Sequence, residues 1–194
     1  MKKLNVLIFG LIVTLGLSSC IKEDSYDENA QFEMEKPLLE QYAKEHFTKP
    51  MLNQTLGIWY DVLKEGDPDS YEYKLIEDDQ NLDNRHIEAP EVTVKYSLHL
   101  LDGTTIEDQS TGVKISLGGT IYAWQFAFLP EGIDSRGGIS GLTENGLKKG
   151  SQIRFVTPSR WAYRNSTVGN IPKNSPLVFE IEVLDIHSPE DTAE

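Results

Sequence analysis

The sequence predicts an α+β fold in which several antiparallel strands form a strongly bent sheet with at least one covering helix. Two late segments, residues 151–156 and 177–186, have the apolar composition of strands. The Asp-Gly pair at residues 102–103 follows a segment of alternating polarity and is a strong signal for a β-hairpin. Only residues 33–47 show an extended run in which apolar residues recur at the spacing of a helix. Many strands with little helix favour an α+β domain over a fold of alternating strands and helices.

The first part of the chain has the composition of an export signal. Two lysines precede a mostly apolar run over residues 6–17, which is shorter than the roughly 20 residues needed to span a bilayer. The residues Leu17-Ser18-Ser19-Cys20 resemble the lipobox of bacterial lipoprotein signal peptides. Cys20 is the only cysteine, so it has no partner for an internal disulfide, and lipid attachment explains its presence. We therefore expect a lipoprotein signal peptide over residues 1–19 and lipidation of Cys20; the alternative is an ordinary signal peptide with a chance cysteine.

An acidic, polar segment over residues 20–32 predicts a flexible tether. Its start, Cys20 to Asp24, also resembles a surface-export signal of lipoproteins in one group of Gram-negative bacteria, and a generic tether is the alternative. We expect an outer-membrane lipoprotein on the periplasmic face or the cell surface. The net charge of −13 argues against a nucleic-acid partner, since phosphate binding needs a basic surface, and against electrostatic adhesion to anionic lipid. Contact with a membrane is therefore expected through the lipid anchor.

A helix is predicted over residues 33–47, within an N-terminal helical segment of residues 33–54. Pro37 fits the first turn of this helix, and Pro50 marks its exit. The residues expected on its apolar face are Leu38, Leu39, Tyr42 and Phe47. The helix is expected either to pack on the main domain or to act as a spacer.

The main domain is expected over residues 55–187, followed by a polar tail over residues 188–194. Strands are predicted where residues alternate in polarity or form short apolar runs, at residues 55–63, 92–98, 113–118, 151–156 and 177–186. Irregular structure is predicted where the chain is polar or rich in glycine and proline, at residues 77–90, 132–150 and 158–176. A short helix is predicted near Leu142 to Leu147, within the second of these irregular segments.

The order of short motifs along the main domain resembles the FKBP-type peptidyl-prolyl cis-trans isomerases. The motifs are Leu56 to Gly66, Val92 to Tyr96, Leu101 to Asp108, Ile115 to Gly118, Ile121 to Trp124, Gly146 to Gly150, Ile153 to Pro158, Ala162-Tyr163, Gly169 to Pro172 and Leu177 to Ile186. The likeness covers about residues 55–187. It implies a bent antiparallel sheet wrapped on one short helix, with an aromatic cavity between them.

The resemblance also implies the residues of this cavity. Carried over by position, the catalytic residues are Tyr96, Glu107, Trp124, Tyr163 and Phe179. The substrate-binding walls are Ile106, Val113, Ile121 and Ile171. In the family, the backbone N–H at the position of Ile121 and the phenol at the position of Tyr163 hold carbonyl groups of the ligand. Purely structural roles are the alternative, because strand aromatics are often core residues and Glu107 at a strand end is often only a solvated charge.

Several positions depart from the pattern of the family. Phenylalanine is usual where this chain has Ile106 and Val113, and aspartate is usual where it has Glu107. A glycine of the family is replaced by Arg164, and extra residues lie within the range 125–145. These changes predict a wider and softer pocket, and therefore weak catalysis.

Isomerisation about proline is the chemistry that the resemblance implies. Rotation about a peptide bond costs about 18–20 kcal/mol, because resonance keeps the amide planar. The twisted amide has less charge separation, so a dry apolar cavity favours it over water. This chemistry needs no cofactor and no metal, and we expect neither. We expect an isomerase or folding helper that acts on proline-containing peptides or unfolded proteins. The alternatives are a non-catalytic FKBP-like module that binds a peptide or partner, and a surface lipoprotein for glycan or nutrient capture.

Overall fold

The computed structural model of the 194-residue chain describes residues 26–78, 81–133 and 140–189. The predicted signal peptide, Cys20 and the first part of the predicted tether lie outside the described residues, as does the end of the predicted tail. No helix within the described ranges is long and apolar enough to cross a membrane.

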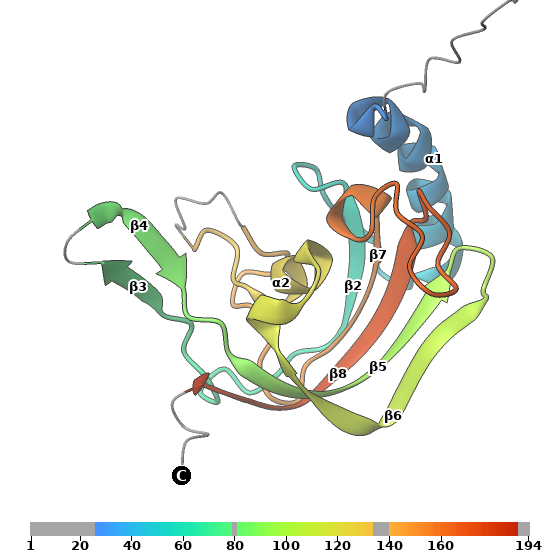
Figure 1. Ribbon diagram of the computed structural model, residues 1–194. Coiled ribbons are helices and arrows are strands. Elements are labelled where there is room, and N and C mark those ends of the chain that lie inside the picture. The colour runs from blue at the N-terminus through green and yellow to red at the C-terminus, as the bar shows by residue number, and fades with distance from the viewer. Residues whose placement is uncertain (1–25, 79–80, 134–139, 190–194) are drawn as a thin grey trace, which may run out of the picture.

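A six-stranded antiparallel sheet forms the centre of the molecule, with the strand order β1-β2-β7-β8-β5-β6. Its strands are β1 (Met51–Asn53), β2 (Ile58–Lys64), β5 (Glu91–Leu100), β6 (Thr105–Ser116), β7 (Gln152–Thr157) and β8 (Leu177–His187). The sheet bends around the short helix α2 (Tyr122–Phe128), which lies inside the curve (Figure 1). The predicted fold class, a bent antiparallel sheet wrapped on a short helix, is therefore confirmed.

The main hydrophobic core fills the space between the concave face of the sheet and α2. Successive residues of a strand point to opposite faces, so Phe155 and Phe179 face α2 whereas Val156 and Val178 face away from it. The buried residues of α2 are Ala123, Trp124, Phe126, Ala127 and Phe128. Because an isolated helix of this length is unstable in water, this burial is what holds α2 in place.

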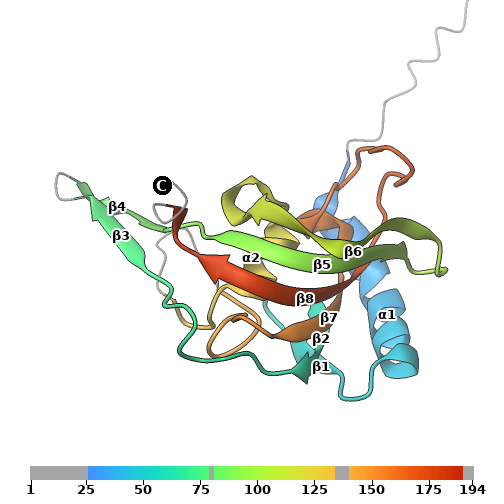
Figure 2. The same ribbon diagram turned by 90° about the horizontal axis from the view of Figure 1, so that it is seen from below.

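Helix α1 (Glu28–His46) packs on the outer face of the sheet, against β2 and β7 (Figure 2). Asp27 caps its N-terminus by accepting two backbone N–H groups at 3.0 Å. The helix therefore begins before the predicted start, and residues 28–32 are helical rather than part of a tether. Leu38, expected on the apolar face, is 50% exposed. The residues that pack on Val156 and Val178 are Leu39, Ala43 and Phe47.

Strands β5 and β6 form the predicted hairpin around the Asp-Gly turn. Gly103 in this turn has a φ of +84°, which glycine adopts without strain. Strand β6 begins at Thr105, earlier than the strand predicted at residues 113–118. Its first half is polar and exposed, so it carries no apolar signal in the sequence. Polar edge strands of this kind are stabilised mainly by their backbone hydrogen bonds.

A second, two-stranded sheet occupies part of the predicted loop at residues 77–90. Strand β3 (Leu75–Asp78) pairs antiparallel with β4 (Asn81–Ile87), and the hairpin projects from the main body (Figure 1). The loop prediction is therefore wrong for the residues up to Ile87. The polar composition gave no signal for these strands. Polar and apolar residues have the same backbone N–H and C=O groups, and these groups form the hydrogen bonds between strands.

The short helix predicted near Leu142 to Leu147 is absent from that segment, which instead forms turns. The backbone N–H groups of Leu142 and Leu147 donate to carbonyls in the last turn of α2, at 2.8 and 2.9 Å. Carbonyls in the last turn of a helix have no partner inside that helix. The segment therefore closes the end of α2, and its two leucines, at most 2% exposed, pack there into the core.

Candidate active site

A cavity of about 260 Å³ lies between the concave face of the sheet and α2. Strands β5, β6 and β8 supply one wall, α2 and the preceding 3₁₀ turn η1 (Leu117–Gly119) supply another, and the segment after β7 adds Tyr163. The lining residues are Tyr96, Leu98, Glu107, Ile115, Gly119, Thr120, Ile121, Trp124, Tyr163 and Phe179. The structure thus brings together all five residues predicted as catalytic, and also Ile121.

Trp124 is the centre of an aromatic cluster at the floor of this cavity. Its ring centroid lies 5.0 Å from that of Tyr96 and 5.9 Å from that of Phe179, and both contacts are edge-to-face. This geometry directs the positive edge of one ring at the negative face of another. Helix α2 also stacks Phe128 on Trp124, one turn along, at 6.1 Å. With only 4% of its surface exposed, Trp124 is a fixed apolar floor.

A tyrosine and a glutamate form the polar side of the cavity. The hydroxyl of Tyr96 on β5 donates to Oε2 of Glu107 on β6 at 2.5 Å. Burial, and then the hydrogen bond and negative charge of Glu107, raise the pKa of Tyr96 well above its usual range. Burial and the same carboxylate also raise the pKa of Tyr163. Both phenols therefore keep their protons at neutral pH.

Two hydrogen-bond donors on the cavity wall are available to a bound molecule. The hydroxyl of Tyr163 donates to no acceptor among the described residues. The carbonyl of Ile121 accepts the first hydrogen bond of α2, from Trp124 at 3.0 Å, but the N–H of Ile121 has no acceptor within the described ranges. An apolar floor with two free donors above it suits a ligand that has an apolar ring flanked by carbonyl groups.

Three of the predicted substrate-binding residues do not line this cavity. Ile106 and Val113 on β6 are partly buried and pack against the main core, and Ile171 is 3% exposed within that core. The cavity is also lined by four residues that were not predicted from the sequence: Leu98, Ile115, Gly119 and Thr120. Leu98 lies two residues from Tyr96 on the same strand, so the alternation of side chains along a strand could have placed it on the same face.

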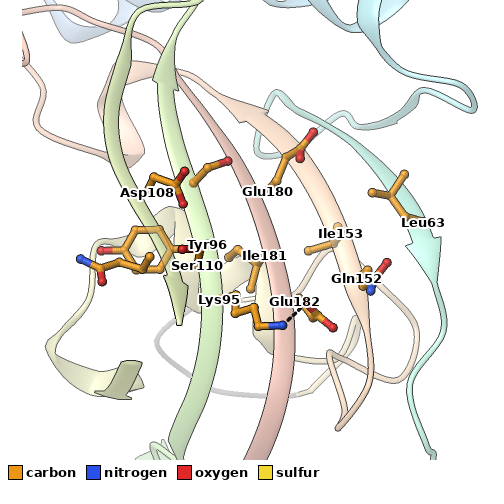
Figure 3. Close-up of a pocket in the computed structure, with 12 residues that line it drawn as sticks. Leu63, Lys95, Tyr96, Asp108, Ser110, Gln152, Ile153, Glu180, Ile181 and Glu182 are labelled. Atoms are coloured by element: carbon orange, nitrogen blue, oxygen red, sulfur yellow. Dashed lines mark hydrogen bonds and ion pairs between the residues drawn. The ribbon is translucent and has the colours of Figure 1, made fainter. Parts of the chain in front are cut away.

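A larger depression, of about 390 Å³, lies on the opposite, outer face of the sheet. Figure 3 shows that charged and amide side chains of β5, β7 and β8 line it, including the ion pair of Lys95 with Glu182, whose N···O distance is 3.3 Å. Tyr96 is the one aromatic residue among the residues drawn there, and the aromatic cluster around Trp124 is not among them. Within the described ranges no three His, Cys, Asp or Glu side chains gather closely enough to hold a metal ion. We therefore take the smaller, aromatic cavity as the candidate active site.

The fold and the cavity together define a class of domain, in which a bent antiparallel sheet closes over a short helix with an aromatic cavity between them. The family model of the FKBP-type peptidyl-prolyl cis-trans isomerases matches residues 84–184, which is slightly more than half of the 194-residue chain. The chain therefore belongs to the FKBP-type peptidyl-prolyl cis-trans isomerase family. Helix α1 and strands β1 and β2 precede the matched residues.

Curated relatives agree with this assignment. The FKBP-type peptidyl-prolyl cis-trans isomerase FkpA of Escherichia coli is 28% identical over 169 residues, which cover 86% of this chain and 49% of that protein. FkpA of Buchnera aphidicola subsp. Baizongia pistaciae is 33% identical over 100 residues, covering 50% of this chain and 34% of that protein. The chain thus spans about half, or less, of the length of these relatives.

Two solved structures share the fold. The crystal structure of FkpA from Escherichia coli gives a TM-score of 0.52 at 24% identity and covers 82% of this chain and 64% of that one. The crystal structure of a peptidyl-prolyl cis-trans isomerase from Pseudomonas syringae gives a TM-score of 0.52 at 20% identity and covers 84% of this chain and 98% of that one.

Proposed function

We propose that this protein is a peptidyl-prolyl cis-trans isomerase that acts on proline-containing peptides or unfolded proteins. The observation that carries the proposal is the aromatic cavity, in which Trp124 forms the floor and Tyr96, Phe179 and Tyr163 stand around it. A proline ring is compact, apolar and of a size that such a cavity can hold. The carbonyl groups on either side of it match the two free donors, Tyr163 O–H and Ile121 N–H.

The proposed mechanism needs no proton transfer and no covalent step. Bond rotation passes through a twisted amide, whose nitrogen and oxygen carry less charge than in the planar form. An apolar surface solvates this state better than it solvates the planar amide, and water does the reverse. Holding the proline ring on Trp124 leaves the preceding carbonyl free to rotate. The phenol of Tyr163 and the N–H of Ile121 then orient the carbonyl groups, which lowers the barrier only if they bind the twisted form better.

Glu107 has a positioning role in this proposal. Its carboxylate binds the hydroxyl of Tyr96 and so fixes the ring that stands edge-on to Trp124. The extra methylene of glutamate, compared with the aspartate usual in the family, still allows this contact.

An isomerisation assay on the purified protein tests the proposal. A proline tetrapeptide should convert between cis and trans faster than in buffer, measured by exchange spectroscopy, which needs no coupling protease. Trp124→Ala should abolish the acceleration, and Trp59→Ala, on the outer face of the sheet, is the matched control. Circular dichroism must show that both variants fold. An unaccelerated rate with the wild-type protein would refute the proposal.

A non-catalytic peptide-binding role is the second candidate. It is favoured by the positions of Ile106 and Val113, which do not line the cavity and leave fewer apolar contacts for a proline ring. This candidate predicts that calorimetry detects binding of the same tetrapeptide while the isomerisation rate stays at the uncatalysed value. Binding of the tetrapeptide together with an accelerated isomerisation rate would support the enzymatic role over the binding role.

We also propose that the protein is a lipoprotein of the outer membrane, on its periplasmic face or at the cell surface. The segment Leu17 to Cys20 and the absence of any other cysteine support this proposal. Labelled palmitate should be incorporated in a bacterial host, and Cys20→Ser should prevent it. Adding Ser25→Cys to that variant supplies a thiol outside the lipobox and should not restore the label. Equal labelling of the wild type and of Cys20→Ser would exclude the anchor.

A further inference from the structure

Helix α1, which lies outside the matched family domain, is bound to the segment that carries Tyr163. Figure 1 shows the segment after β7 beside α1. The contact centres on Glu35, a residue of α1 that is only 2% exposed although it is charged. Ser159 donates to it twice, from its backbone N–H at 2.8 Å and from Oγ at 2.6 Å. Gln31, one turn earlier on α1, donates a third hydrogen bond at 2.8 Å.

Ser159 in turn fixes the backbone on both sides of Tyr163. Its carbonyl accepts the N–H of Ala162 at 2.9 Å and the N–H of Arg164 at 2.9 Å. Ser159 is fully buried, so this point of the chain cannot move without breaking the hydrogen bonds to Glu35. A continuous set of hydrogen bonds therefore runs from α1 through Ser159 to the two neighbours of Tyr163.

The backbone beside Tyr163 needs such support. Arg164 has a φ of +53°, in the left-handed region that favours glycine. Its side chain is held back toward α1: Nε donates to the carbonyl of Arg160 at 3.2 Å and lies 3.5 Å from a carboxylate oxygen of Glu28. Arg160 also pairs with Glu28, at 3.1 Å, and its guanidinium lies 4.7 Å from the ring centroid of Phe32. Residues of α1 thus contact the segment on both sides of Tyr163, at Arg160 and at Arg164.

We infer that α1 braces the active-site loop, and that Glu35 is a positioning residue that sets the place of the Tyr163 hydroxyl over the cavity. The inference rests on the proposed function for its kinetic part only. The brace itself is a property of the unliganded protein. A buried carboxylate with three donors is the group best suited to this role, because each of its hydrogen bonds is charge-assisted and therefore strong.

The test compares Glu35→Gln with Glu40→Gln, which makes the same change at an exposed position of α1 that pairs with Lys44. The neutral amide that replaces the Glu35 carboxylate has one acceptor oxygen, so it cannot accept from both Ser159 donors and Gln31 at once. Backbone hydrogen exchange, followed by nuclear magnetic resonance, should speed up at Ala162 and Arg164 by at least about tenfold, the factor for loss of a hydrogen bond to a charged group. Glu40→Gln should leave both amides unchanged. Unchanged exchange at 162 and 164 in Glu35→Gln overturns the brace, whether or not the protein is an isomerase.

A double-mutant cycle with Tyr163→Phe tests whether the brace acts through the Tyr163 hydroxyl. Glu35→Gln should lower kcat/KM by at least about threefold in the wild-type background, a typical coupling between connected groups. In the Tyr163→Phe background the same change should have little further effect. An equal loss in both backgrounds would mean a general structural role and would overturn the positioning role. Ser159→Ala, which removes one donor but keeps the buried carboxylate and the backbone N–H, is a milder second variant and should give a smaller loss of the same pattern.

Discussion

At the scale of single residues, Glu107 contributes to the raised pKa of both cavity tyrosines, Tyr96 and Tyr163. The carboxylate accepts a hydrogen bond from the phenol at 2.5 Å, and its charge opposes formation of a phenolate. Burial is nevertheless the larger cause of the raised pKa of Tyr96. Removing the charge of Glu107 should therefore lower this pKa without returning it to the usual value. Without the carboxylate, the Tyr96 ring also loses the contact that fixes it against Trp124.

The first prediction concerns this ionisation. In Glu107→Gln the pKa of Tyr96 should fall, because the neutral amide no longer repels a phenolate. The pKa of Tyr163 should fall as well, since the same carboxylate raises it. Tyrosine labelled with ¹³C at Cζ reports both values in a titration followed by nuclear magnetic resonance. Tyr42, whose pKa is raised by burial and by Glu180 rather than by Glu107, is the internal control and should not change. A constant Tyr96 pKa would show that the contact with Glu107 does not form in solution.

The second prediction concerns the hydroxyl of Tyr163. Tyr163→Phe should lower kcat/KM by roughly twofold to twelvefold, equivalent to about 0.5–1.5 kcal/mol for one neutral hydrogen bond. Stability should change little, because this hydroxyl donates to no acceptor among the described residues. Tyr42→Phe, on a half-buried tyrosine at the outer face of the sheet, is the matched control and should leave kinetics unchanged. Wild-type kinetics in Tyr163→Phe would remove the hydroxyl from the mechanism.

Four of the five residues predicted as catalytic lie on regular elements, which helped to place them in one cavity from the sequence; Tyr163, in the turn after β7, is the exception. Tyr96 and Phe179 are on strands whose alternation is plain in the sequence, and Trp124 follows a short motif that the family shares. The resemblance assigned Ile106 and Val113 to the cavity walls, but in the structure they lie on either side of an irregular stretch of β6, where the pairing register with β5 shifts. Gly112, with a φ of +88°, lies in that stretch. A strand pattern cannot reveal a bulge of this kind, since its extra residues break the period of two.

At the scale of elements, Asp61 joins the end of α1 to the sheet. Its Oδ2 accepts the backbone N–H groups of Thr48 and Lys49, at 2.8 and 3.2 Å, and the guanidinium of Arg154 on β7 at 3.0 Å. The side chain is almost fully buried. Burial alone would raise the pKa of Asp61, but the hydrogen bonds from Arg154 and from the two backbone groups outweigh it and lower the pKa below its usual value. The ionised form is therefore the one that stabilises the joint.

The third prediction follows from the sign of this pKa shift. A carboxyl whose pKa is lower in the folded state stabilises the fold above its unfolded pKa, about 3.9, and loses that contribution as the pH falls through the folded pKa. Asp61→Asn should therefore reduce the free energy of unfolding at pH 7 by roughly 1.5–3 kcal/mol, the range for hydrogen bonds to a charged group. The difference from the wild type should shrink below pH 4. Urea unfolding at several pH values measures it.

Asp185→Asn is the control for the joint, because Asp185 also has a lowered pKa but pairs with Lys149 at an exposed site. Exposed pairs contribute little, so this variant should lose less than about 1 kcal/mol at pH 7. If Asp61→Asn and Asp185→Asn reduce the free energy of unfolding by the same amount, burial of Asp61 does not strengthen the contact between α1 and the sheet.

Two elements could not be predicted, for different physical reasons. The hairpin of β3 and β4 is polar, so it lacks the alternation by which other strands were recognised. The segment at residues 142–147 has the apolar spacing of a helix, but its N–H groups bind the end of α2 instead. Local spacing records which residues are buried and does not record which backbone groups they bind. In both cases the backbone hydrogen-bond partner, and not the local residue pattern, determined the structure.

At the scale of the whole molecule, the residues before the family match are part of the fold. Strand β2 lies between β1 and β7, and it pairs with β7 from Trp59, opposite Val156, to Lys64, opposite Gln152. Ile58 at the start of β2 is fully buried in the main core. Removing β2 would expose one edge of β7 and the core side chains that Ile58 covers. The domain boundary that the match suggests therefore cuts through the sheet.

The fourth prediction tests this dependence with fragments of different length. A fragment of residues 84–194 should show no cooperative thermal transition. It lacks β2, and losing the apolar area that β2 buries should cost a large share of the net stability of a domain, which is only about 5–15 kcal/mol. A fragment of residues 48–194 keeps β1 and β2 but lacks α1, so it should fold with reduced stability, since Val156 and Val178 lose their cover. The chain from residue 26 is the reference. Circular dichroism and the dispersion of amide signals distinguish the three. A cooperative transition in the shortest fragment would show that the strands before residue 84 are accessory, and that the sheet closes around α2 without them.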